Sequence, residues 1–362
     1  KTFKDDKVLD RVSLYVPEGK TLVLFGPSGA GKTVLLRLIS GVIEPDEGHI
    51  KISGMDVDGV EPEDRNIGMA FQNFALFPHM DAHANIASPL TAQKKDKSAI
   101  QAGVQGLAKL LKIDHVLKHK PKELSNGQKQ RTALARALAG KPKILLLDDP
   151  LRNVDAKLRF EMRLELPNLL YEQNATVIYV TQDYKEAMAF GDQIAVINGG
   201  VIQQIGTPEA IYLTPANVEI ARLFGDPVIN LLDVTLQKDA SGVFALISEK
   251  RIDLDASYAS VVGLECCLGI RPESVLFVDR DHKSAVPVTV EAETPLNEKT
   301  VNLCLTARGR EIMASRPSGT QGSAGGEAFV AIEAASALIF DKQTGALIET
   351  NSTDISERGK VT

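Results

Sequence analysis

Up to about residue 225, short apolar runs alternate with stretches whose apolar residues recur with the period of a helix. Runs short enough for buried strands lie at 22–25, 49–52, 67–71, 143–148 and 177–181. Helical patterns lie at 34–40, 99–111, 125–140, 157–172 and 185–190. A partly alternating pattern at 3–16 predicts strands, and Asn198-Gly199-Gly200 predicts a hairpin between 194–197 and 201–205. This alternation predicts an α/β domain.

The pattern changes at Gly225-Asp226-Pro227. Beyond it, turn residues separate short alternating runs, which is typical of an all-β barrel or sandwich. These runs lie at 231–237, 242–247, 259–270, 284–292, 300–307 and 327–340. We therefore expect two domains, 1–225 and 226–362, with a mainly helical region at about 73–140 inside the first.

Composition narrows the class of protein but not its function. The 362 residues are enough for two or three domains, and the 44% hydrophobic content supports a sizeable core. The net charge of −6 argues against nucleic acid as the main partner. The three cysteines lack metal spacing and are typical of reduced thiols in a cytosolic protein. No apolar run approaches the roughly 18 residues of a membrane span, no signal peptide is visible, and the initial lysine suggests a trimmed start.

A glycine-rich turn joins the first buried run to the first helical pattern. Its residues are Gly26, Pro27, Ser28, Gly29, Ala30, Gly31, Lys32 and Thr33. This is the spacing of a phosphate-binding loop, in the strand–turn–helix context that supports one. Glycines let backbone N–H groups close on phosphate oxygens, and the helix start adds the positive end of its dipole. Lys32 is then a candidate ligand of the β- and γ-phosphates, and Thr33 of Mg²⁺.

The apolar run at 143–148 ends in two aspartates, Asp148 and Asp149. Downstream of a phosphate loop, such a strand is typical of a Walker B, whose carboxylate binds Mg²⁺ directly or through water. Asp148 is therefore a candidate metal ligand. Asp149 stands where a base could polarise the attacking water.

The segment Leu124-Ser125-Asn126-Gly127-Gln128 opens the helical pattern at 125–140. It resembles the L-S-G-G-Q signature of ATP-binding cassette (ABC) proteins and lies between the phosphate loop and the Walker B strand. The resemblance implies that its last four residues form a second anion site, which closes on ATP held by another subunit. Without that context, the segment would be an ordinary N-capped helix.

The resemblance extends along nearly the whole chain to ATPase subunits of maltose-type carbohydrate importers, through segments at 64–72, 75–80 and 268–273. It implies that Phe3 stacks on adenine and that Gln72 reaches Mg²⁺ and the attacking water. It also places Asp155 in a D-loop at the dimer interface. The alternative for Phe3 is a hydrophobic residue at a poorly ordered chain end.

A protein of this family is the ATP- and Mg²⁺-dependent ATPase subunit of an importer. The resemblance implies a P-loop NTPase cassette with a helical subdomain, followed by an OB-like (TOBE/MOP-type) β-barrel that regulates and does not bind nucleic acid. The implied partners are a second ATPase subunit, two transmembrane permease subunits and, indirectly, a solute-binding protein. We expect it at the cytoplasmic face of the cell membrane. The expected solute is a sugar or a polyol such as glycerol, with iron, polyamine and sulfate left open.

Four positions depart from the family pattern. Asp149 stands in place of the catalytic glutamate, Gln182 in place of the switch histidine, Asn126 in place of a glycine and Arg152 in place of a D-loop serine. The shorter aspartate misplaces its carboxylate by about 1 Å, which can cost about 100-fold in rate. Glutamine can donate a hydrogen bond to a phosphate but cannot take up a proton near neutral pH. Asn126 tolerates unusual backbone angles, so we expect the signature to function.

In an ABC dimer, each ATP site combines the Walker side of one subunit with the signature of the other. Because Asp149 and Gln182 both belong to the Walker side, the hypothesis is a heterodimer in which this chain holds ATP in a slow site. A homodimer that tolerates both substitutions is the nearest alternative. A nucleotide-gated regulatory subunit without useful ATPase activity is another, and a soluble ABC ATPase of DNA repair or translation lacks support, since no heptad run is present.

Overall fold

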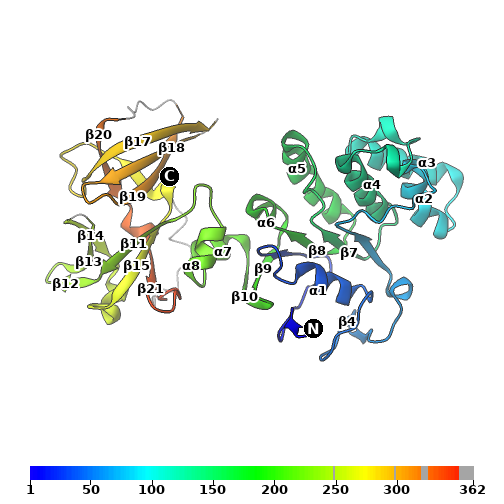
Figure 1. The fold of residues 1–362 in the computed structure, drawn as a ribbon, viewed down its shortest axis with the longest axis horizontal. Coiled ribbons are helices and arrows are strands. Elements are labelled where there is room, and N and C mark those ends of the chain that lie inside the picture. The colour runs from blue at the N-terminus through cyan, green and yellow to red at the C-terminus, as the bar shows by residue number, and fades with distance from the viewer. Residues whose placement is uncertain (248, 297–298, 319–324, 350–362) are drawn as a thin grey trace. The chain divides into compact units, whose positions relative to one another are not determined.

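The computed structural model describes residues 1–247, 249–296, 299–318 and 325–349 (Figure 1). Its contacts divide the chain into two units, Lys1–Glu209 and Ala210–Thr362. The division falls inside α7 (Pro208–Leu213), earlier than residue 226, where the sequence suggested a boundary. None of the helices in the described ranges has the length and apolarity that crossing a bilayer requires.

A six-stranded sheet forms the centre of the first unit, in the order β10-β9-β3-β8-β7-β6. Its strands are β3 (Thr21–Phe25), β6 (Ile67–Ala70), β7 (Ile144–Asp148), β8 (Thr176–Thr181), β9 (Gln193–Asn198) and β10 (Val201–Gly206). All neighbours pair in parallel except the β9–β10 hairpin. In β3, β7 and β8 every residue after the first is buried, as in parallel strands covered on both faces. The predicted α/β core is confirmed, and the carboxyl ends of these strands meet at one edge.

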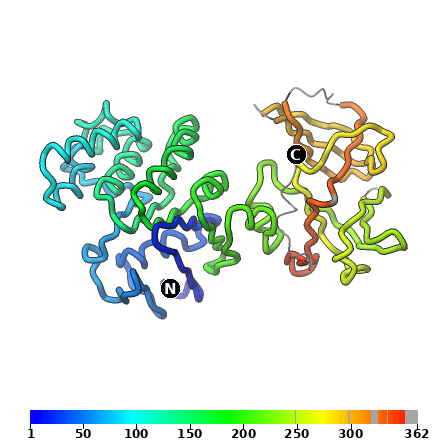
Figure 2. The backbone as a smooth tube through the Cα atoms, turned by 180° about the vertical axis from the view of Figure 1, so that it is seen from behind, coloured from blue at the N-terminus to red at the C-terminus, as the bar shows by residue number. Residues whose placement is uncertain are grey.

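The helices of the first unit follow the predicted periods except α2, which lies in the region predicted only as mainly helical. They are α1 (Lys32–Ile39), α2 (Ala82–Ala92), α3 (Lys97–Leu110), α4 (Asn126–Ala139), α5 (Ala156–Glu172) and α6 (Tyr184–Phe190). Helices α2, α3 and α4 pack on one another as a group, cyan to green in Figure 2. The stretch 73–81 before α2 is not helical. Phe74 and Ala75 have positive φ values of 66° and 46°, and Pro78 disfavours helical angles in the residue before it.

The N-terminal stretch 3–16 differs from its prediction as strands. Its only strand residues are those of a short two-stranded ribbon near the N-terminus, β1 (Thr2–Phe3) paired with β2 (Asp6–Lys7). Residues 8–16 form no strand, and the N–H of Asp10 donates to the carbonyl of Gly200 at 2.9 Å. Their apolar side chains pack against the core beneath the phosphate loop. The alternation therefore reflects one-sided contact with that core. A second short ribbon joins β4 (Lys51–Ile52) to β5 (Met55–Asp56).

The second unit is β-rich, as predicted, and its described part also contains the short α-helix α8 (Val218–Leu223) after α7. Its sheets run β11-β15-β21, β12-β13-β14 and β16-β20-β17-β18-β19. The strands are β11 (Asn230–Thr235), β12 (Gln237–Asp239), β13 (Gly242–Ile247), β14 (Lys250–Leu254), β15 (Glu265–Ile270), β16 (Val275–Phe277), β17 (Val286–Leu296), β18 (Lys299–Thr306), β19 (Glu311–Pro317), β20 (Glu327–Ile332) and β21 (Leu338–Asp341). Residues 350–362 of the predicted domain lie outside the described part.

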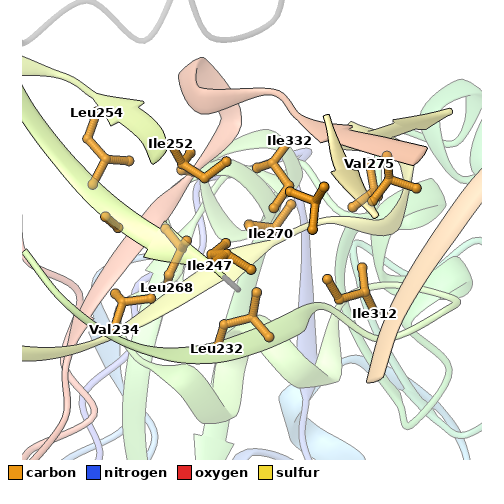
Figure 3. Packing of buried hydrophobic residues seen from close by; sticks show 14 of the residues in the cluster. Leu232, Val234, Ile247, Ile252, Leu254, Leu268, Ile270, Val275, Ile312 and Ile332 are labelled. Carbon is orange, nitrogen blue, oxygen red and sulfur yellow. The ribbon is translucent and has the colours of Figure 1, made fainter. Parts of the chain in front are cut away.

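One hydrophobic core joins the three sheets of the second unit. Leu232, Ile247, Leu268 and Ile270 point toward one another in it (Figure 3). The late strands β20 and β21 run back to pair with β16, β17 and β15, so the orange end of the chain lies among yellow strands in Figure 2. Non-local pairing of this kind supports the predicted OB-like class more than a simple meander.

Buried Arg271 fixes the helical entrance of the second unit to its sheets. Its guanidinium donates to the carbonyls of Tyr212, at 2.8 Å, Ala221, at 3.0 Å, and Phe224. It also stacks over the ring of Tyr212, 3.9 Å from the centroid. These contacts explain why the end of α7 and the whole of α8 group with the strands that follow them.

Replacing Arg271 with methionine should lower the free energy of unfolding by about 3 kcal/mol, because buried carbonyls lose their donors. Denaturant unfolding of the whole chain measures the effect. The matched control is Arg280→Met, which removes an exposed guanidinium 6.0 Å from the Phe329 ring. Equal unfolding midpoints for the two variants would contradict this role of Arg271.

Candidate nucleotide site

The phosphate loop lies between β3 and α1, where its geometry depends on glycine. Gly31 caps α1 with a φ of 96°, a left-handed conformation that favours glycine. A Cβ at this position would lie 2.6 Å from Leu9 Cδ2 and 2.9 Å from the Val8 carbonyl. The loop can therefore turn into the helix start only with glycine here, which leaves the first N–H groups of α1 available to an anion.

Lys32 is held at the first turn of α1 with its ammonium inside the loop. Nζ donates to the carbonyls of Gly26, at 2.7 Å, and Pro27, at 2.6 Å. Only 7% of the residue is exposed. Burial lowers the pKa of Lys32, and the charges of Asp149 and Asp148 partly oppose that shift. A poorly hydrated ammonium at a helix start is suited to binding phosphate.

Asp148 ends β7 beside Thr33, which follows Lys32 in α1. The Thr33 hydroxyl donates to the two carboxylate oxygens of Asp148, at 3.0 and 3.2 Å. Burial raises the pKa of Asp148, although the Thr33 hydrogen bond, Arg37 and Lys32 lower it. A hydroxyl and a carboxylate in contact are the oxygen donors that Mg²⁺ prefers. The donor set therefore fits Mg²⁺.

One pocket of about 290 Å³ gathers most of the residues that the sequence singled out. Its lining includes Ser28, Gly29, Ala30, Gly31, Lys32, Thr33, Gln72, Asp148, Asp149, Arg152 and Gln182. Residues from the ends of four different strands thus meet at the carboxyl edge of the sheet. Val8, Val34 and Val180 also line it, and the sequence did not single them out as site residues.

The predicted site residues outside this lining are Phe3, Gly26, Pro27, Asp155 and the signature residues 125–128. Phe3 lies in β1 with 41% of its surface exposed. Ser125 caps α4, where its hydroxyl accepts from the N–H of Gln128 at 3.3 Å and the Gln128 side chain accepts from the Ser125 N–H at 2.9 Å. Asn126 and Gly127 begin the helix. Asp155 caps α5 by accepting from the N–H of Leu158 at 3.0 Å.

The backbone of Asp149 is held in an uncommon conformation, with a φ of 51°. Its N–H donates to the carbonyl of Val180 at 2.9 Å, and its own carbonyl accepts from Gln130 Nε2 at 2.6 Å. Arg152 Nη1 lies 3.8 Å from its carboxylate. Burial raises the pKa of Asp149, while Arg152 lowers it. A non-glycine residue at positive φ persists only where its surroundings hold it, as they do here.

Gln130 is a site residue that the sequence did not reveal. It is buried on α4, and its side chain connects Asp149 to the N–H of Asn153, which donates to Oε1 at 2.8 Å. Gly127 lets α4 approach this turn, because a Cβ there would lie 2.8 Å from the Asn153 carbonyl. The signature helix is thereby joined to the end of the Walker B strand. The only signal in the sequence was a glutamine within an alanine-rich helix.

Glu186, on α6, is a second residue near the site that the sequence did not reveal. It lines a neighbouring pocket together with Asp149 and Gln182. Its buried carboxylate accepts from the hydroxyls of Tyr179, at 2.9 Å, and Thr181, at 2.8 Å. Burial raises the pKa of Glu186 from 4.5 to about 7, against the lowering by both hydrogen bonds. The folded chain therefore binds this proton more tightly than the unfolded chain does. Stability contributed by Glu186 is full below pH 4.5 and is lost as the pH rises through about 7.

Glu186→Gln should remove this pH dependence, since an amide keeps the shape and an accepting oxygen but does not ionise. As the pH rises from 5 to 8, the parent chain loses stability and the variant does not. The difference in unfolding free energy should therefore shift by up to roughly 3 kcal/mol in favour of the variant. Denaturant unfolding at both pH values measures this difference. The control is Glu165→Gln, at an exposed position on α5. A difference that does not change with pH would contradict the assignment.

Comparisons with known proteins show which family the chain belongs to. The model of the ABC transporter family matches residues 9–152. The chain is 40% identical to the trehalose/maltose import ATP-binding protein MalK of Thermococcus litoralis, over 96% of this chain and 97% of that protein. It is 42% identical to the sn-glycerol-3-phosphate import ATP-binding protein UgpC of Psychromonas ingrahamii, over 76% of this chain and 72% of that protein.

Among solved structures, the chain is similar to the ATP-binding cassette MJ0796 in a dimeric post-hydrolysis state bound to ADP and Pi. The TM-score is 0.54 with 30% identity, over 57% of this chain and 94% of that one. The similarity thus includes both the cassette and, through the MalK relative, the β-rich unit that follows it. The chain therefore belongs to the ATP-binding proteins of ABC transporters and is an ABC-type ATPase.

Proposed function

We propose that the chain is the ATP-hydrolysing subunit of an importer for a small polar solute, a sugar or a polyol such as glycerol. The names of its relatives support this class, since they import trehalose or maltose and sn-glycerol-3-phosphate. In this proposal the chain acts at the cytoplasmic face of the cell membrane. Its helical region contacts two transmembrane permease subunits, and a solute-binding protein delivers the solute to them. The second unit regulates and does not bind nucleic acid.

The proposed cofactors are ATP and Mg²⁺. The loop from Gly26 to Thr33 would surround the phosphates, with Lys32 at the β- and γ-phosphates. Thr33, Asp148 and Gln72 would hold Mg²⁺, which supplies positive charge to the phosphate oxygens. The hydroxyl–carboxylate contact and the shared pocket support these roles. Phe3, exposed near the chain start, would stack on adenine.

One observation carries the mechanism that we propose: Asp149 and Gln182 line the same pocket as the phosphate loop. Both departures therefore affect the ATP that this chain itself holds. The signature residues Ser125 to Gln128 lie outside that pocket, and the Ser125–Gln128 capping contacts order the helix start. We propose an asymmetric heterodimer, in which a different ATPase subunit uses this signature while the chain's own site turns over slowly.

Uptake by cells from which the gene has been deleted tests the transport function. Deletion should abolish uptake of one labelled solute from a panel of sugars, glycerol and glycerol phosphates, and the intact gene should restore it. The Lys32→Met variant should not restore it. The panel also contains iron, spermidine and sulfate, and loss of one of these instead would contradict the carbohydrate or polyol assignment.

A regulatory subunit with little ATPase activity is a second candidate, favoured by the Arg152 guanidinium beside the Asp149 carboxylate. In that case ATP binding alone would gate the transporter. Variants that bind ATP but have lost the Asp149 carboxylate would then support full uptake. Reduced uptake would favour hydrolysis at this site.

A further inference from the structure

Arg152 is a half-exposed residue of the pocket that the phosphate loop lines. It lines that pocket together with Lys32, Thr33, Asp149 and Gln182. It also lines the neighbouring pocket with Asp149 and Gln182. A cation thus lies beside Asp149 and Gln182, the two residues proposed to act on the attacking water and the outermost phosphate.

The backbone that carries Arg152 is fixed from both sides. The Arg152 N–H donates to the carbonyl of Asp149 at 3.3 Å, which closes a tight turn. The carbonyl of Arg152 accepts from Arg159 Nη2 at 2.9 Å. Gln130 holds the start of this turn through Asp149 and its end through Asn153. Because the turn is preorganised, the guanidinium can meet an anion with little loss of backbone entropy.

The contact that Arg152 makes with Asp149 is weak enough to be exchanged. At 3.8 Å, it is longer than a hydrogen bond, and 53% of the Arg152 side chain is exposed. Half-exposed ion pairs contribute little to stability. A phosphate carries more charge than a carboxylate and matches the planar donors of a guanidinium, so it would compete for Arg152.

We propose that Arg152 is a γ-phosphate-binding cation of its own chain's nucleotide site. This inference rests on the proposed ATP-binding function. Lys32 in the loop would serve the β- and γ-phosphates, and Arg152, beside Asp149 and Gln182, would contact the outermost phosphate. Gln182 offers a neutral donor at that phosphate, and Arg152 adds the positive charge that glutamine lacks. The residue therefore makes the site discriminate ATP from ADP and holds ATP tightly where hydrolysis is slow.

Nucleotide binding to the purified full-length chain tests this role. Titration with Mg²⁺-ATP and Mg²⁺-ADP yields the ratio of the two affinities. Arg152→Gln should weaken ATP binding by about tenfold and leave ADP binding within about twofold. Arg152→Lys keeps the charge and should retain part of the preference. The matched control is Arg163→Gln, which removes a guanidinium that lies over the Phe160 ring, 5.8 Å from its centroid.

The outcomes separate this inference from the proposed function. If the parent chain binds neither nucleotide, the ATP-binding function itself is wrong. If the parent chain binds ATP, an unchanged or increased ATP preference in Arg152→Gln would overturn the role of Arg152. Equal weakening of ATP and ADP would also overturn it. So would an effect that appears only after a second ATPase subunit is added, since Arg152 would then act on the partner's nucleotide.

Discussion

Replacing Asp149 with glutamate and Gln182 with histidine should raise ATP turnover of the chain by about 100-fold. Asp149 lines the phosphate pocket from the end of β7, but its carboxylate stops one methylene short of where a glutamate would reach. Glutamate would extend toward the water that attacks the γ-phosphate, and histidine would add a group that takes up a proton near neutral pH. Steady-state phosphate release by the double variant measures the gain.

The single variants should each recover less than the pair, because residues that act as a unit in catalysis are not additive. The matched control is Asp192→Glu with Gln203→His, which makes the same chemical changes at positions outside the pocket lining. No gain from the double replacement in the pocket would mean that these two residues do not limit turnover. The asymmetric-dimer proposal would then lose its physical basis.

Replacing Lys32 with methionine should weaken Mg²⁺-ATP binding by at least about 100-fold. The buried ammonium is the one charged donor that the loop itself supplies, and a hydrogen bond to a charged group contributes about 1.5–3 kcal/mol. Losing two such contacts with phosphate oxygens costs at least about 3 kcal/mol. At 1.4 kcal/mol per tenfold, this is a loss of about 100-fold or more in affinity. Calorimetric titration of the full-length chain measures the affinity directly.

Lys20→Met is the control for this change. It removes an exposed ammonium whose partner, Asp192, lies 2.9 Å away, at the other end of β3. We expect ATP affinity to stay within about twofold of the parent chain, since a surface ion pair contributes little. Equal effects of the two substitutions would indicate that ATP binds outside the loop.

The central part of the cassette could be predicted from the sequence, because the phosphate loop and the Walker B strand are local patterns. Each pattern can be recognised from a few neighbouring residues, because its chemical role depends on them alone. The patterns are the loop glycines, the lysine at the helix start and a buried strand that ends in aspartate. Their meeting in one pocket follows from parallel strands, whose carboxyl ends share an edge.

Contacts between distant segments could not be predicted in this way. The Gln130 bridge and the burial of Glu186 depend on how α4 and α6 pack against the sheet. The approach of Arg152 to Asp149 is local, because the turn between these residues brings them together. The prediction of strands at 3–16 was wrong, because an alternating pattern cannot distinguish a strand from an irregular segment that covers a core on one side. In the second unit, β19 (Glu311–Pro317) was missed, since its glutamate, serine and arginine interrupt the apolar pattern.

The most direct test of the proposal is ATP turnover of the purified chain, alone and then mixed with the ATPase subunit encoded beside it. We predict slow turnover alone despite ATP binding, and rapid turnover in the mixture, because the partner's ATP would use the signature at residues 124–128 of this chain. Rapid turnover by the chain alone would contradict this prediction. It would show that Asp149 and Gln182 are sufficient for catalysis and that a homodimer is the active form.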